Sequence, residues 1–77
     1  MTDSKKFNEI VKRHEMKVYE IATALGMSAQ TLYNKLNNCT EFSQTEMAKF
    51  RNIFPDVTDD EFKAIFFAEE LSAEVNE

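Results

Sequence analysis

Few residues in this sequence are arranged for catalysis or metal binding. His14 has no second ligand at a suitable spacing, and Cys39 is a single cysteine, so neither indicates a metal site. The acidic residues between 56 and 61 lack the central glycine and the alternating oxygen ligands of a calcium loop, and helix capping explains them better. No catalytic carboxylate pair, nucleophile elbow or glycine-rich phosphate loop is present. The sequence therefore predicts a binding protein and not an enzyme, with no metal, cofactor or small-molecule substrate.

Length and composition predict one helical domain spanning residues 1–77. The chain has one Gly and one Pro among 77 residues, which favours uninterrupted helices over strands and turns. A single Cys and the absence of a signal peptide predict a reducing cytoplasm. No apolar run approaches the roughly 18–20 residues that span a membrane, so no membrane partner is expected.

The net charge of −5 is unevenly distributed along the chain. Residues 1–51 hold eight Lys or Arg and six Asp or Glu, whereas residues 52–77 hold one Lys and eight Asp or Glu. An acidic chain is unusual for a protein that neutralises phosphates. If the first half contacts a nucleic acid, the second half must face away from it.

Apolar spacing and capping signals predict an all-α bundle of about five helices. The helices are expected at roughly 4–14, 17–25, 28–38, 43–54 and 58–73, with a frayed tail at 74–77. Ser4, Ser28, Ser43 and Thr58 are the expected N-caps, the last two within capping boxes. The side chains expected to face the core are Phe7, Ile10, Val11, Val18, Ile21, Ala22, Leu25, Leu32, Leu36, Met47, Phe50, Ile53, Phe54, Phe62, Ile65 and Phe66.

The segment from 17 to 37 meets the requirements of a helix-turn-helix. Gly26 can take the left-handed conformation that ends a helix, and only Met27 and Ser28 follow before the next helix. So short a connection forces the two helices to cross steeply. Ala22 supplies the small side chain needed where they approach, and apolar residues spaced on both helices lock the pair together.

These residues resemble the Cro and phage-repressor class of helix-turn-helix proteins, also called XRE-type. The resemblance rests on Ala22, on Gly26-Met27-Ser28 and on the run from Thr31 to Asn37, and it covers roughly residues 7–67. It implies a lambda-repressor-like DNA-binding domain, closest to small phage-encoded Cro-like regulators acting in a bacterial host. The implied function is sequence-specific binding of duplex DNA at short inverted repeats, as a transcriptional repressor.

The resemblance also implies which residues contact DNA. In this class the third helix enters the major groove, which would make Ala29, Gln30, Tyr33 and Asn34 the base-reading residues. Amide side chains can bond adenine N6 and N7 together, and alanine can contact the thymine methyl group. Phosphate contacts are expected at both ends of the motif, from Lys17, Val18, Ser28, Lys35, Asn37, Asn38 and Thr40.

Two further expectations concern protein partners. Phe67 and Leu71 lie on a separate flank of the fifth predicted helix, where they either widen the core or form the interface of a homodimer. Dimers of this class place two third helices in successive major grooves. The alternative function is an acidic protein-binding module of the same fold, such as an antirepressor or an inhibitor of a host protein, without DNA binding.

Overall fold

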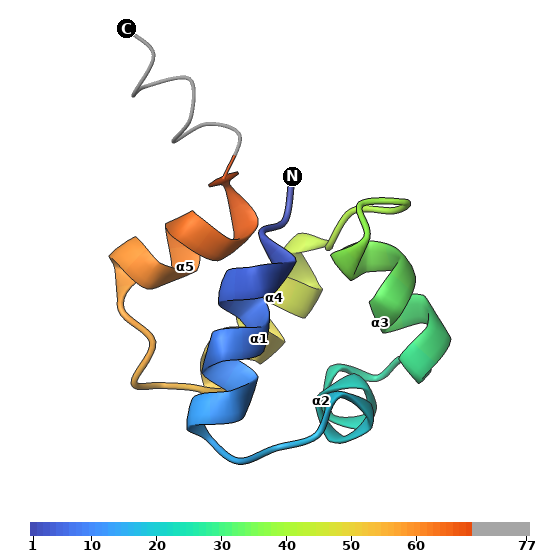
Figure 1. The fold of residues 1–77 in the computed structure, drawn as a ribbon, viewed down its shortest axis with the longest axis horizontal. Coiled ribbons are helices and arrows are strands. Elements are labelled where there is room, and N and C mark those ends of the chain that lie inside the picture. Colours follow the sequence, from blue (N-terminus) through green and yellow to red (C-terminus); the bar gives the residue numbers. More distant parts are fainter. Residues whose placement is uncertain (69–77) are drawn as a thin grey trace, which may run out of the picture.

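The computed structural model describes residues 1–68, which form five α-helices and no strand (Figure 1). The helices are α1 (Ser4–Arg13), α2 (Val18–Leu25), α3 (Ala29–Leu36), α4 (Gln44–Ile53) and α5 (Asp59–Phe66). The predicted all-α bundle is therefore confirmed for this part of the chain. None of the described helices is long and apolar enough to cross a membrane.

Three of the four predicted N-caps are present. The Ser28 hydroxyl oxygen caps α3 by accepting a backbone N–H at 3.1 Å. Ser43 and Thr58 accept the backbone N–H groups of Glu46 and Glu61, each at 3.1 Å. The two glutamate carboxylates in turn accept the N–H of their cap residue, which completes both predicted capping boxes.

The predicted cap of the first helix is wrong by one residue. Asp3, and not Ser4, caps α1, because its carboxylate accepts the N–H of Lys6 at 3.2 Å. The Asp3 backbone is extended, and its own N–H donates to the carbonyl oxygen of Ile65 at 2.7 Å. This contact with α5 holds Asp3 outside the helix, so that Ser4 becomes the first helical residue.

The ends of α2 and α3 are marked by residues with a left-handed backbone. Gly26 ends α2 with a φ of 79°, and Asn38 adopts a φ of 63° after α3. Both values lie in the left-handed region that Gly and Asn tolerate best.

The helix predicted to reach residue 73 is interrupted earlier. Phe67 follows α5 as its C-cap, with a φ of −126° and a ψ of 37°, which is not helical. Phe67 itself is half-buried, packs against the core, and has its ring 6.1 Å from that of Phe62. Leu71 and the tail predicted at 74–77 lie outside the described residues.

Aromatic rings fill the centre of the fold. Phe50 of α4 is fully buried, with its ring centroid 5.3 Å from Phe7 of α1 and 5.0 Å from both Phe54 and Phe66. The Phe54 and Phe66 rings meet the Phe50 ring edge-to-face, an arrangement that stabilises aromatic pairs beyond the burial of their area. Phe50 therefore links α1, α4 and α5 in a single core.

Four residues that were expected in the core are only half-buried. Val18, Met47, Ile53 and Phe62 pack against the core without being enclosed by it. They lie at the margins of the apolar stripes, and a chain of this length buries too small a share of its surface to cover both margins. The guanidinium of Arg51 covers part of Phe62, at 4.8 Å from the ring centroid.

The helices are arranged so that α3 lies at the edge of the molecule. Figure 1 shows α3 on the right and α5 on the left, with α1 and α4 between them. The same view looks nearly along the axis of α2, whereas α3 runs across the page, so the two helices cross steeply. Contacts join α2 to α3 and α4, and α1 to α5.

An ion-pair network ties the end of α1 to the segment before α5. The His14 ring lies on Phe54, and its Nε2 is 2.7 Å from a carboxylate oxygen of Asp56. Its Nδ1 is 2.9 Å from the carbonyl oxygen of Ile10. Only the doubly protonated imidazolium can donate to both oxygens, so the Ile10 carbonyl and then Asp56 raise the pKa of His14 above 6.5. The hydrogen bond from His14 also lowers the pKa of Asp56.

We expect the stability of the protein to fall as the pH rises through the raised pKa of His14. A group whose pKa is higher in the folded state stabilises the fold fully below its unfolded pKa and loses this effect above its folded pKa. Urea midpoints should therefore be lower at about pH 8.5 than at about pH 6. His14→Gln, which keeps a hydrogen-bonding side chain but does not titrate, should have similar midpoints at both values. A wild-type urea midpoint that stays constant over this pH range would contradict the assignment of a doubly protonated His14 in the folded protein.

Candidate nucleic-acid interface

The pair α2 and α3 fixes the direction of the α3 side chains. Ala22 is 1% exposed at the contact between the helices, and Gly26 reaches back with its N–H to the carbonyl oxygens at the end of α2. Leu32 and Leu36 of α3 are buried on the inner side of the helix. The opposite side of α3 must then face solvent, because side chains on one helix alternate between faces with its 3.6-residue period.

Three of the four predicted base-reading residues lie on or beside this outer face. Gln30 and Tyr33 are exposed, and Ala29 and Asn34 are half-buried. The Gln30 amide nitrogen donates to the Asn34 amide oxygen at 3.1 Å, so the two residues form a pair. Gln30, Tyr33 and Asn34 thus lie on the outer side of α3, whereas Ala29, seven residues before the buried Leu36, lies toward its inner side.

The beginning of α2 carries an acidic residue that the prediction of phosphate contacts did not consider. Lys17 is exposed. The side chain of Val18 packs against the core, so Val18 could contact a phosphate only through its backbone N–H. The Glu20 carboxylate folds back over this end of α2 and accepts the N–H of Lys17 at 2.9 Å. A phosphate that approached this helix end would meet the carboxylate. The spacing of Lys17 and Glu20, with Glu at the third helical position, was the available signal.

Tyr19 is a second residue that the sequence reasoning did not single out. Its side chain is 58% exposed on α2, a large exposed fraction for an aromatic residue, and Tyr33 on α3 is 47% exposed. Tyr19 lies off the apolar stripe of α2, which was the signal for its exposure.

At the far end of α3, Lys35 is held within the protein. Its ammonium donates to the carbonyl oxygen of Glu41 at 2.9 Å, pairs with the Glu46 carboxylate at 3.2 Å and lies 5.8 Å from the Phe42 ring. Burial by itself would raise the pKa of Glu46, but the N–H of Ser43 and the Lys35 ammonium lower it below its usual value. The Lys35 side chain is only 12% exposed, so its contacts are internal.

Two other predicted phosphate contacts are exposed, but their side chains already form hydrogen bonds with the protein itself. The Asn38 amide forms two hydrogen bonds with the backbone of Thr2, as acceptor at 2.8 Å and donor at 3.2 Å. The Ser28 hydroxyl caps α3 and bonds the Thr31 hydroxyl at 2.9 Å. Asn37 and Thr40 are exposed.

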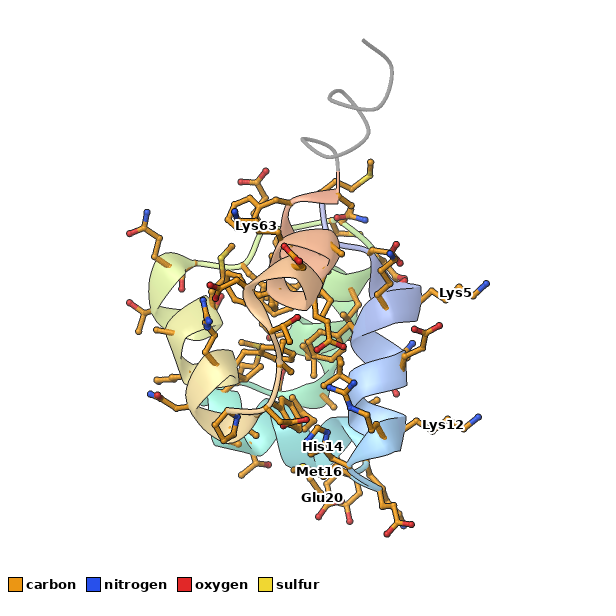
Figure 2. All side chains as sticks on the ribbon, turned by 90° about the vertical axis from the view of Figure 1, so that its left-hand side faces the viewer. Lys5, Lys12, His14, Met16, Glu20 and Lys63 are labelled. Carbon is orange, nitrogen blue, oxygen red and sulfur yellow. The ribbon has the colours of Figure 1, made fainter. Side chains whose placement is uncertain are left out.

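Four acidic residues, at 56 and 59–61, cluster around the start of α5. The acidic residues around the start of α5 pair with cations from α1 and α4: Asp56 and Glu61 with Arg13, and Asp59 with Arg51. They lie on the side of the molecule opposite α3 (Figure 1). On α1, Lys5 and Lys12 project from one outer side, whereas Lys63 lies on α5 (Figure 2). No group of His, Cys, Asp and Glu in residues 1–68 could hold a metal ion.

Comparison with protein families shows to which family the chain belongs. The family described as "Phage regulatory protein CII (CP76)" matches residues 4–61, about three quarters of the sequence. The chain belongs to this family. No curated protein and no solved structure matches it. The expectation of a phage regulator is therefore confirmed for this CII-family protein, whereas the narrower resemblance to the Cro class stays a prediction.

The internal contacts of Lys35 predict a structural role for its side chain. Lys35→Ala should lower the free energy of unfolding by about 1–2 kcal/mol, because Glu46 loses a partly buried charged partner. Lys17→Ala, which removes an exposed lysine, should change it by less than about 0.5 kcal/mol. Urea unfolding measures both values. Equal stability of the two variants would mean that the Lys35 ammonium is free in solution and available to a ligand.

Proposed function

We propose that this CII-family regulator binds duplex DNA sequence-specifically through α3, which enters the major groove. The observation that carries the proposal is the outward, polar face of a helix held steeply across α2 by a three-residue turn. An α-helix fits the width of the major groove, and amide side chains match the hydrogen-bonding edge of adenine. The protein would act as a small transcriptional regulator, by binding and not by catalysis.

The charge distribution supports the same orientation. The acidic side of the molecule, at the start of α5, lies away from α3, so binding through α3 does not bring these carboxylates against phosphates. Lys17, Asn37 and Thr40 are exposed near the two ends of the α2–α3 unit and are the proposed phosphate contacts. Backbone N–H groups in the first turn of α2 would add little to them, because the Glu20 carboxylate lies over this helix end.

The proposed regulatory outcome is repression at short inverted repeats, bound by a homodimer. One α3 contacts only a few base pairs, and a two-fold dimer would place a second one in the next major groove along the same face of the DNA. Phe67, half-buried beside Phe62, is the proposed interface residue within the described part of the chain.

Salt dependence provides the first test of DNA binding. The affinity for duplexes selected from a random pool should fall steeply between about 50 and 200 mM salt, because counterions are released from the DNA. Lys17→Ala should weaken binding to all sequences alike and reduce the salt slope by about one. Lys63→Ala is the matched control, since this lysine lies on α5, and it should leave the slope unchanged. Fluorescence anisotropy of labelled duplexes measures the DNA affinity of the wild type and the two variants at each salt concentration.

Two results of this experiment would overturn parts of the proposal. Equal effects of Lys17→Ala and Lys63→Ala would show a non-specific attraction between cations and DNA, without the proposed orientation. Failure of the wild type to bind any duplex at about 50 mM salt would favour the acidic protein-binding module instead.

The Glu20 carboxylate should weaken DNA binding by this protein. Glu20→Gln keeps an oxygen that can accept the Lys17 N–H but removes the negative charge, so affinity at about 50 mM salt should rise several-fold and the gain should shrink at higher salt. Asp60→Asn removes the same charge on α5 and should change affinity much less. Equal gains from both substitutions would mean that only the net charge matters.

A further inference from the structure

The two amide side chains on the outer face of α3 are joined by a hydrogen bond. Gln30 and Asn34 are four residues apart, which places them one helical turn apart on the same face. The Gln30 Nε2 donates to the Asn34 Oδ1 over 3.1 Å. Asn34 is the shorter and more buried of the two, whereas Gln30 is exposed and has one more rotatable bond. In this pair, therefore, Asn34 is the less mobile side chain, and its hydrogen bond restricts the conformation of Gln30.

The bond leaves Gln30 with the groups that adenine requires. A glutamine amide has two N–H donors and one carbonyl oxygen. One donor is used on Asn34, so one N–H and the Oε1 remain. Adenine presents an acceptor at N7 and a donor at N6 in the major groove, and the remaining groups complement both. Guanine presents two acceptors there, so the Gln30 Oε1 would face an oxygen without a proton between them.

We propose that Asn34 is a positioning residue for Gln30, and that the pair reads one A·T base pair as a single unit. This inference rests on the proposed DNA binding through α3. An exposed glutamine loses side-chain freedom when it binds a base, and a residue that already holds the amide in place reduces this entropic cost. The preference for adenine at one position thus depends on both residues, although only Gln30 contacts the base edge.

The alternative is that each amide reads a base of its own. Independent readers would give two positions of preference in the operator, each lost with one substitution, and their effects would add. A single coupled unit gives one position, lost with either substitution, and the double variant is no worse than the single ones. A double-mutant cycle separates these two arrangements.

The test uses the full chain and a duplex chosen from a random pool by the wild type. Affinities are measured for duplexes with each of the four base pairs at every position of the site. Gln30→Ala and Asn34→Ala should each lower the preference for A·T at the same position, by about 5- to 150-fold, the range expected of one bidentate contact. The double variant should match the single ones. Asn52→Ala, an asparagine on α4, should leave the preference intact.

A conservative substitution distinguishes positioning from direct reading. Asn34→Asp keeps an oxygen that can accept the Gln30 N–H but has no donor of its own. Its negative charge should weaken binding to all sequences, whereas the A·T preference should persist if Asn34 acts through Gln30. Loss of that preference in Asn34→Asp, or additive losses at two different positions, would overturn the inference while leaving DNA binding through α3 in place. A wild type that binds no duplex would overturn both.

Discussion

The close contact between α2 and α3 is the constraint on which the outer surface of this protein depends. The left-handed backbone at Gly26 ends α2 abruptly, and the small side chain of Ala22 is buried on α2. Once Leu32 is buried against this contact, the 3.6-residue period of the helix leaves Gln30 and Tyr33 no inward position. The polar face of α3 therefore follows from apolar packing on its other side.

Several of the basic side chains form ion pairs with carboxylates of the same chain. Arg13 and Arg51 pair with carboxylates next to α5, and Lys35 pairs with Glu46. These three cations belong to the half of the chain with a positive balance, and each is paired with a carboxylate of the protein. Fewer cations remain for phosphates than the sequence suggests, so affinity for DNA would depend more on contacts with bases.

Agreement between the sequence and the structure is best where the interactions are local. Ser28, Ser43 and Thr58 cap their helices as expected, because each bonds a group only three residues away. Ser4 was a wrong cap because a contact with Ile65, far along the chain, fixes the Asp3 backbone outside the helix.

In the candidate site, too, local features could be predicted from the sequence and long-range contacts could not. The side chains on the outer face of α3 could be predicted from helical spacing, since spacing alone decides which face they share. The internal roles of Asn38 and Lys35 could not. The partner of Asn38 is Thr2, 36 residues away, and Lys35 folds onto the loop and helix that follow.

By itself, the sequence determined the presence of the five helices, the caps of α3, α4 and α5, the turn at Gly26, and the membership of the chain in a family of phage regulators, because these depend on short-range spacing and residue type. Only the tertiary structure decided which polar side chains remain available to a partner. A lysine or an asparagine has the same local pattern whether it faces solvent or bonds a distant carboxylate, and only the packing of the helices brings such partners together.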